Sequence, residues 1–125
     1  ILAYRAAIDI DDQHTVALNN LYTLYVESGD LQAAGAIEAQ VERNRRKNPY
    51  YLHYLAEIAN EEQRWSDAIG LLNRAIRLES NEYRFHYALA QAHYSSGDTE
   101  GAYASLDRAR ELAPAGFEEE PLTLP

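Results

Sequence analysis

The sequence contains no cysteine and no methionine. Without cysteine the chain can form no disulfide, no thiolate metal site and no cysteine nucleophile. The absence of cysteine does not indicate a cellular compartment, because a chain without cysteine suits reducing and oxidising surroundings alike. The chain begins at Ile1, and its first eight residues already read as the middle of a helix without an N-cap. We therefore expect the natural start of the protein to lie upstream.

Long apolar runs and basic residues are also scarce. No apolar stretch approaches the roughly 18 residues that cross a bilayer, and the first residues lack the charged start and apolar core of a signal peptide. Eleven Lys and Arg stand against twenty Asp and Glu, which gives a formal net charge of −9. Such a surface repels phosphate backbones and anionic lipid headgroups. Nucleic acid and membrane surfaces are therefore poor candidate partners.

Catalytic, metal and cofactor motifs are missing as well. The sequence has no P-loop, no GxGxxG and no GxSxG, and no serine stands beside a histidine in a recognised arrangement. His86 and His93 lie seven residues apart on one helix face, but without a carboxylate at zinc-site spacing, so packed histidines are the better interpretation. The basic run from Arg43 to Lys47 is typical of a solvated helix end, where cations complement the helix dipole. We expect no catalytic residue, no metal and no cofactor.

What the sequence does have is a repeat of 34 residues. Six columns align at this period: Leu18, Leu52 and His86; Leu21, Leu55 and Leu89; Tyr25, Ala59 and His93; Gly29, Gln63 and Gly97; Ala34, Ala68 and Ala102; and Val41, Ala75 and Ala109. Within each copy the apolar residues recur at three- and four-residue steps, and short polar turns interrupt them. The pattern predicts helices at 15–28 and 31–46, at 49–62 and 65–79, and at 82–96 and 98–112, after a helical remnant at 1–10.

These helices group into three repeats. We expect them at 15–48, 49–82 and 83–114, preceded at 1–14 by a turn and the second helix of a truncated leading repeat. Pro114 and Gly116 should end the last helix. Residues 115–125 are expected to be a flexible acidic tail. The remnant lacks a polar cap, so its apolar side chains predict either self-association through the N-terminal end of this piece or the loss of a covering domain present in the parent protein.

The columns resemble the tetratricopeptide repeat, which has a small residue in its first helix, Gly at the turn, and Ala and Pro in and after its second helix. The third copy matches this pattern at Leu89, Ala90, Gly97, Ala102, Leu106, Ala109 and Pro114. The resemblance covers residues 1–114 and implies an all-α, right-handed solenoid of antiparallel helix-turn-helix hairpins. The first copy departs from it: Tyr22 replaces a small residue, Glu38 replaces an aromatic or Leu, and Gly35 costs about 1 kcal/mol relative to Ala.

The first helix of each repeat has a second face beside its core stripe, and in this family that face lines a concave groove. Carried to this sequence, the face includes Asn60 and the residues that we predict to bind a partner: Asn19, Thr23, Tyr50, His53, Glu57, Arg84, Tyr87, Gln91 and Tyr94. Rigid aromatics with one Arg and several amides are typical of a peptide-binding surface. The family's clamp for a C-terminal carboxylate is disfavoured, because Asn19 stands at the expected Lys and Ala88 at the expected Arg.

The sequence therefore predicts a module that binds a peptide or partner domain in its groove and is not an enzyme. An alternative comes from a narrower resemblance. The segments from Asn48 to Tyr51 and from Tyr83 to Ala90 are similar to repeats at the end of some bacterial proteins with an upstream transglutaminase-like domain. That resemblance implies an accessory segment that docks or positions a catalytic domain lying upstream.

Overall fold

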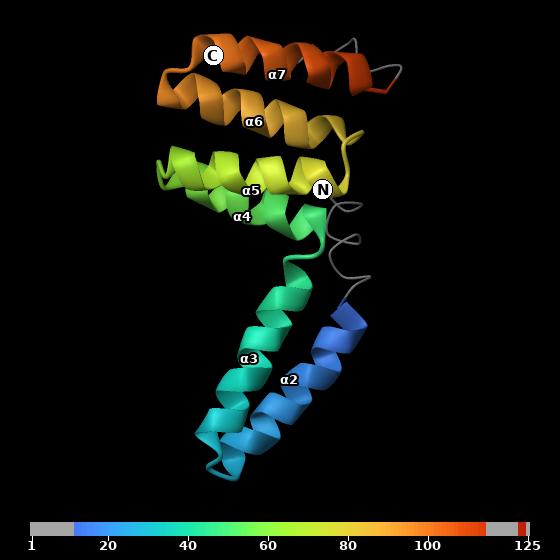
Figure 1. The fold of residues 1–125 in the computed structure, drawn as a ribbon, viewed down its shortest axis with the longest axis vertical. Coiled ribbons are helices and arrows are strands. Elements are labelled where there is room, and N and C mark those ends of the chain that lie inside the picture. Colours follow the sequence, from blue (N-terminus) through green and yellow to red (C-terminus); the bar gives the residue numbers. More distant parts are fainter. Residues whose placement is uncertain (1–11, 115–122, 125) are drawn as a thin grey trace. The chain divides into compact units, whose positions relative to one another are not determined.

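Helices make up nearly all of the part that the structure describes. The computed structural model of the chain describes residues 12–114 and 123–124, and within them it has six α-helices and no strand (Figure 1). Their bounds are α2 Asp12–Glu27, α3 Leu31–Arg45, α4 Pro49–Glu61, α5 Trp65–Leu78, α6 Tyr83–Ser96 and α7 Thr99–Leu112. The predicted all-α fold of helices in adjacent pairs is confirmed.

The helix ends agree with the prediction within one residue, except at the start of α2. This helix begins at Asp12, whereas the sequence pattern placed its start at residue 15. The pattern was wrong there because it read the acidic residues before Thr15 as a turn, although carboxylates are favourable in a first helical turn. The predicted remnant at 1–10 and the tail residues 115–122 lie outside the described residues.

The two helices of each pair join through a turn with one left-handed residue. Gly29 and Gly97 have φ angles of 82° and 96°, which glycine adopts without strain. The middle turn has Gln63 in the same column, with φ at 61°. After the first and third turns an aspartate caps the next helix: Asp30 accepts from the Ala33 N–H and Asp98 from the Gly101 N–H.

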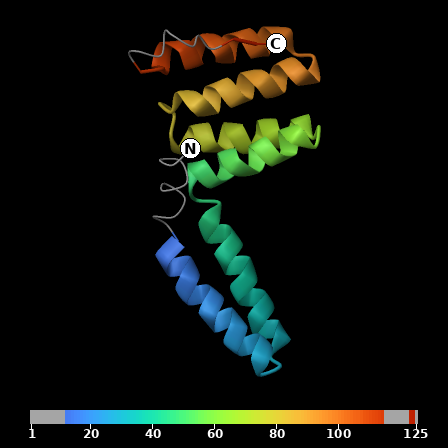
Figure 2. The same ribbon diagram turned by 180° about the vertical axis from the view of Figure 1, so that it is seen from behind.

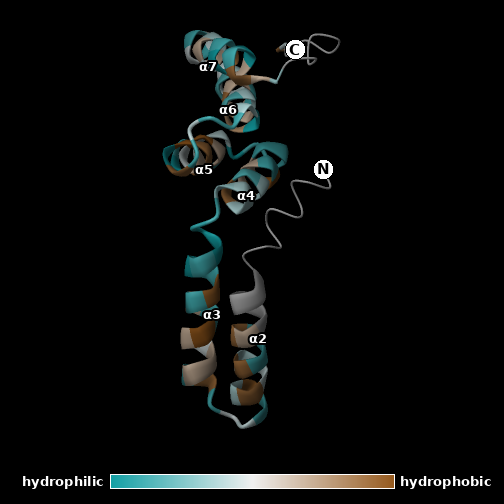
Figure 3. Cartoon of the chain, turned by 90° about the vertical axis from the view of Figure 1, so that its right-hand side faces the viewer, coloured by the Kyte–Doolittle hydropathy of each residue, from teal (hydrophilic) through white to brown (hydrophobic). Residues whose placement is uncertain are grey.

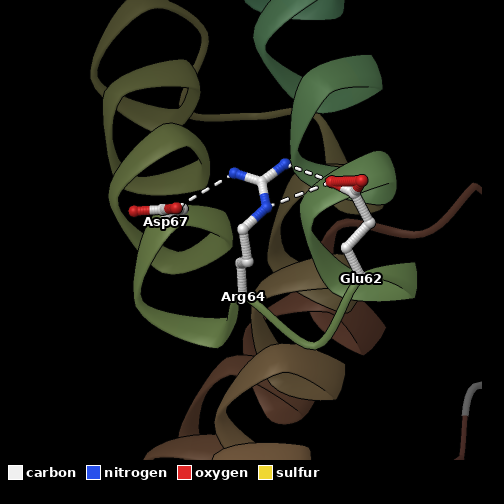
Figure 4. Close-up of polar contacts among 3 residues, drawn as sticks. All are labelled: Glu62, Arg64 and Asp67. Atoms are coloured by element: carbon white, nitrogen blue, oxygen red, sulfur yellow. Dashed lines mark hydrogen bonds and ion pairs between the residues drawn. The ribbon is translucent and has the colours of Figure 1, made fainter.

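The middle turn has Arg64 in place of that capping aspartate. Arg64 precedes α5 and makes no side-chain capping bond. Its guanidinium instead bridges the turn: Nε lies 3.1 Å from Glu62 Oε1, and Nη1 lies 3.0 Å from Asp67 Oδ2 (Figure 4). All three side chains are exposed, so the bridge holds the turn without adding to the core.

The described helices belong to two compact units, Ile1–Tyr51 and Leu52–Pro125. In unit 1, α2 and α3 pack against each other as a hairpin. Among residues 17–51, whose burial is described, the buried apolar residues are Ala34 and Val41, while Leu24 and Leu31 are 60% and 70% exposed. In α3 the half nearer the α2–α3 turn is mainly apolar, and the end that leads to α4 is polar (Figure 3). Residues 17–51 therefore bury few apolar side chains.

Unit 2 has the larger core. Helix α6 lies between α5 and α7 and packs against both (Figure 2). Small residues from α4, α5 and α6 form the centre, with Leu72 and Leu89 among them: Ala56, Ala59, Ala68 and Ala92. Ala68 and Ala102 are completely buried, which is the environment that the repeat register predicted for their column. Alanines there let the helices approach closely.

Candidate binding groove

Five of the predicted groove residues meet around one pocket in unit 2. The pocket has a volume of about 250 Å³. Helices α4 and α6 supply its polar wall, which we call the binding face: His53, Glu57, Asn60, Arg84, Tyr87 and Gln91. The apolar part of the lining is Ala56, Leu72 and Ala88. His53 with Tyr87, and Glu57 with Gln91, are 34 residues apart, so the repeat period brings equivalent positions of neighbouring copies together.

His53 is the most deeply buried member of the binding face, at 6% exposed. Its ring lies 5.4 Å from the Phe85 ring in a tilted arrangement. Burial, and then the positive charge of Arg84, lower the pKa of His53 to about 4. They do so although Glu57 Oε1 lies 3.5 Å from Nε2. His53 is therefore neutral at pH 7 and provides a flat aromatic wall rather than a charge.

Two opposite charges flank this wall. The Arg84 guanidinium lies over the Tyr83 ring, with 5.7 Å from Cζ to the centroid, and its Nε is 3.8 Å from Glu82 Oε1. Both contacts come from neighbouring residues and hold the guanidinium near the pocket. On α4, burial and the nearby Glu61 raise the pKa of Glu57. The pocket thus combines a cation and an anion on opposite helices.

Hydrogen-bonding groups complete the binding face. Asn60 Oδ1 is a buried acceptor for which no donor is found among the described residues. The hydroxyl of Tyr87 donates to the main-chain carbonyl of Thr123, with 3.0 Å between the oxygens. Tyr87 therefore already binds polypeptide backbone, from a segment 36 residues further along the chain.

The other predicted groove residues do not line this pocket. Asn19, Thr23 and Tyr50 belong to unit 1. Asn19 lines a separate pocket of about 370 Å³ between α2 and α3, where Glu38 is also found. The Thr23 hydroxyl donates to the Asn19 carbonyl in its own helix, and the Tyr50 N–H donates to Asn48 Oδ1. Tyr94 is partly buried on α6, outside the pocket lining.

The two histidines of α6 are packed, as their places in two core columns of the repeat predicted. His86 is buried, and its Nε2 lies 2.9 Å from the Ser80 carbonyl. His93 is partly buried, and its Nδ1 lies 3.3 Å from Asp98 Oδ2. Among residues 12–114 no three His, Asp or Glu side chains gather as a metal site would require.

Sequence reasoning missed part of this pocket. Ala56 and Leu72 stand in columns of the repeat pattern, and Ala88 was considered only as the residue at the clamp's expected Arg. A small or apolar residue gives no sign in the sequence that it also reaches a surface pocket. Thr123 was assigned to a flexible tail without a role in binding. It takes part through its main-chain carbonyl, which every residue has, so no sequence signal could have identified it.

Helical hairpins that stack small residues and align equivalent side chains along one face define a helical repeat protein. Residues 59–118 match the family model of the tetratricopeptide repeat, and the adjacent helix pairs of the structure support this assignment. Repeats of this family form protein–protein interaction modules, and this chain is one. A search of curated proteins finds no match to the chain. Within the described residues, no helix is long and apolar enough to cross a membrane.

Proposed function

We propose that the binding face of unit 2 holds an extended segment of a partner polypeptide, and that the chain acts by binding rather than by catalysis. The hydrogen bond from the Tyr87 hydroxyl to the Thr123 carbonyl is the observation that carries this proposal. Its acceptor is a main-chain group, so the same donor can bind a carbonyl of any extended peptide. The bond fixes the position of a backbone without restricting the side chain.

The rest of the pocket supports peptide recognition. The buried Asn60 Oδ1 can accept a main-chain N–H. Arg84 and Glu57 offer one charge of each sign, and the Ala56 and Leu72 surfaces suit an apolar side chain. Specific pockets commonly combine an apolar lining with a few placed polar groups in this way.

The lining also supports binding over catalysis. It includes no serine, threonine or cysteine, and its hydroxyl is the phenol of Tyr87. His53, the one candidate base, has a pKa near 4, well below the value near 7 that suits a general base at neutral pH. The alternative role, in which the repeats position an enzyme domain upstream, stays a prediction.

A random peptide library displayed on phage tests the proposal. Peptides selected on the full chain should lose at least about tenfold in affinity when Arg84→Ala and Tyr87→Ala are combined, since Tyr and Arg side chains that a partner covers are typical binding hot spots. Both side chains are only partly buried, so the helical circular dichroism and the melting temperature should stay nearly unchanged. Tyr103→Ala is the matched control, because Tyr103 is 51% exposed on α7. Selected peptides that bind the double variant as well as the parent would refute the proposal.

A further inference from the structure

The carbonyl that accepts the hydrogen bond of Tyr87 on the binding face belongs to Thr123 of the same chain. Helix α7 ends at Leu112, and the described residues 123 and 124 lie beyond it without helical structure. Thr123 is exposed and Leu124 is partly buried. In an extended segment that lies on a surface, successive side chains point alternately towards the surface and towards solvent, which agrees with the burial of these two residues.

The local sequence favours this extended form. Leu124 precedes Pro125, and the residue before a proline is biased away from helix towards extended backbone. The chain between Pro114 and Thr123 is also long enough to return. Nine residue steps (123 minus 114) span up to about 30 Å when extended, whereas a 14-residue helix such as α7 measures about 21 Å.

We propose that the Thr123–Leu124 segment is an intramolecular occupant of the binding face and competes with the partner polypeptide for Tyr87. The proposal rests on the proposed function in one respect, the site at which the partner binds. The Tyr87 hydroxyl carries one hydrogen, so it can donate fully to one carbonyl at a time. A partner backbone that takes this bond therefore displaces Thr123.

The competition is favoured by the covalent link between segment and site. A covalent link of this length gives the segment an effective concentration on the order of millimolar. A segment with a comparable dissociation constant fills the site about half of the time, and the apparent affinity for an outside peptide falls about twofold. Tighter binding of the segment to its own chain lowers the apparent affinity for an outside peptide further. The partner must therefore bind more tightly than this segment, so weak ligands do not displace it.

The first test asks whether the segment occupies the face, and it needs no partner. The chain has no cysteine, so Thr123→Cys carries a single nitroxide label while the main-chain carbonyl is kept. Amide signals of Tyr87 and Gln91 should be broadened by the label and should recover when Tyr87→Phe removes the donor. A label at Tyr103→Cys, on exposed α7, is the matched control and should broaden a different set of signals.

Two outcomes of this test would overturn the proposal. One is the absence of selective broadening at Tyr87 and Gln91. The other is broadening in a mixture of isotope-labelled chain without nitroxide and unlabelled chain with nitroxide, because the segment would then bind a second copy. Either result leaves the phage-display test of the proposed function standing, so the two failures are distinguishable.

The second test measures competition with a synthetic peptide of residues 119–125. The full-length Leu124→Glu variant should bind this peptide at least about twofold more tightly than the parent chain, because its own segment is released. Leu78→Glu is the matched control: it makes the same change at a leucine that is 51% exposed at the end of α5. Equal affinity of the parent and Leu124→Glu, or an equal gain for Leu78→Glu, would contradict the competition.

Discussion

Lowering the pH from 7 to 5 should destabilise the protein through His53. This side chain is 6% exposed, and burial followed by the charge of Arg84 lowers its pKa to about 4. In the unfolded chain the ring regains its ordinary pKa of 6.5. Between these two values the unfolded state binds a proton that the folded state excludes, so the free energy of unfolding falls as the pH falls.

The size of the effect follows from the two pKa values. A difference from 6.5 to about 4 corresponds to roughly 3 kcal/mol, at about 1.4 kcal/mol per pH unit. The contribution is fully present above pH 6.5 and fully lost below pH 4, and about 2 kcal/mol of it disappears between pH 7 and pH 5. Glu57 changes the free energy of unfolding in the opposite direction. Its pKa is raised in the folded state, so the folded chain binds its proton more tightly and this group adds stability as the pH falls.

Urea unfolding at pH 7, 6 and 5, followed by circular dichroism at 222 nm, measures the loss. His53→Gln is the control, since it removes the titrating ring and keeps every other titratable side chain. We expect the parent to lose about 2 kcal/mol more than this variant over the range. Parallel pH profiles for the two proteins would refute the buried, neutral histidine.

Three further substitutions test the packing and the turns by thermal or urea unfolding. Ala102→Leu should cost about 1 to 3 kcal/mol by overpacking a completely buried site, whereas Ala104→Leu on the exposed side of α7 should change stability by less than about 0.5 kcal/mol; equal melts would contradict the repeat register. Gln63→Gly should stabilise by about 0.5 to 1 kcal/mol, because the relief of a left-handed non-glycine residue exceeds the added entropy of the unfolded chain. Gly35→Ala should stabilise α3 by about 1 kcal/mol, since an added Cβ meets nothing within 4 Å, and a loss of stability would mean that this face is covered.

The fold could be predicted closely because its signal is repeated. The same apolar and small residues recur every 34 residues, and each copy corrects errors in the others. Helix ends followed from Pro49 and from the glycine turns, which the structure places where expected. The start of α2 was missed because the acidic residues before Thr15 were assigned to a turn, although Asp is also a common residue at a helix start.

For the candidate site, the sequence could predict only the helix face on which each side chain lies. The 3.6-residue period placed Glu57, Tyr87 and Gln91 on one side of their helices, and in unit 2 they do share a pocket. Asn19, on the same face of the first copy, lines a different pocket with Glu38. The sequence period assigns a side chain to a face, but the depth of a pocket depends on how closely neighbouring helices pack.

The middle turn shows how packing overrides local preference. The two outer turns have glycine followed by a capping aspartate, and the middle one has Gln63 and Arg64. Losing a cap costs about 1 kcal/mol and a left-handed glutamine about 1 to 2 kcal/mol, whereas exposed ion pairs like those of Arg64 contribute about 0 to 1 kcal/mol. The bridge therefore offsets only part of the cost. Ala59 and Ala68, completely buried on either side of the turn, fix the path of the chain between them, so tertiary packing holds this turn in place.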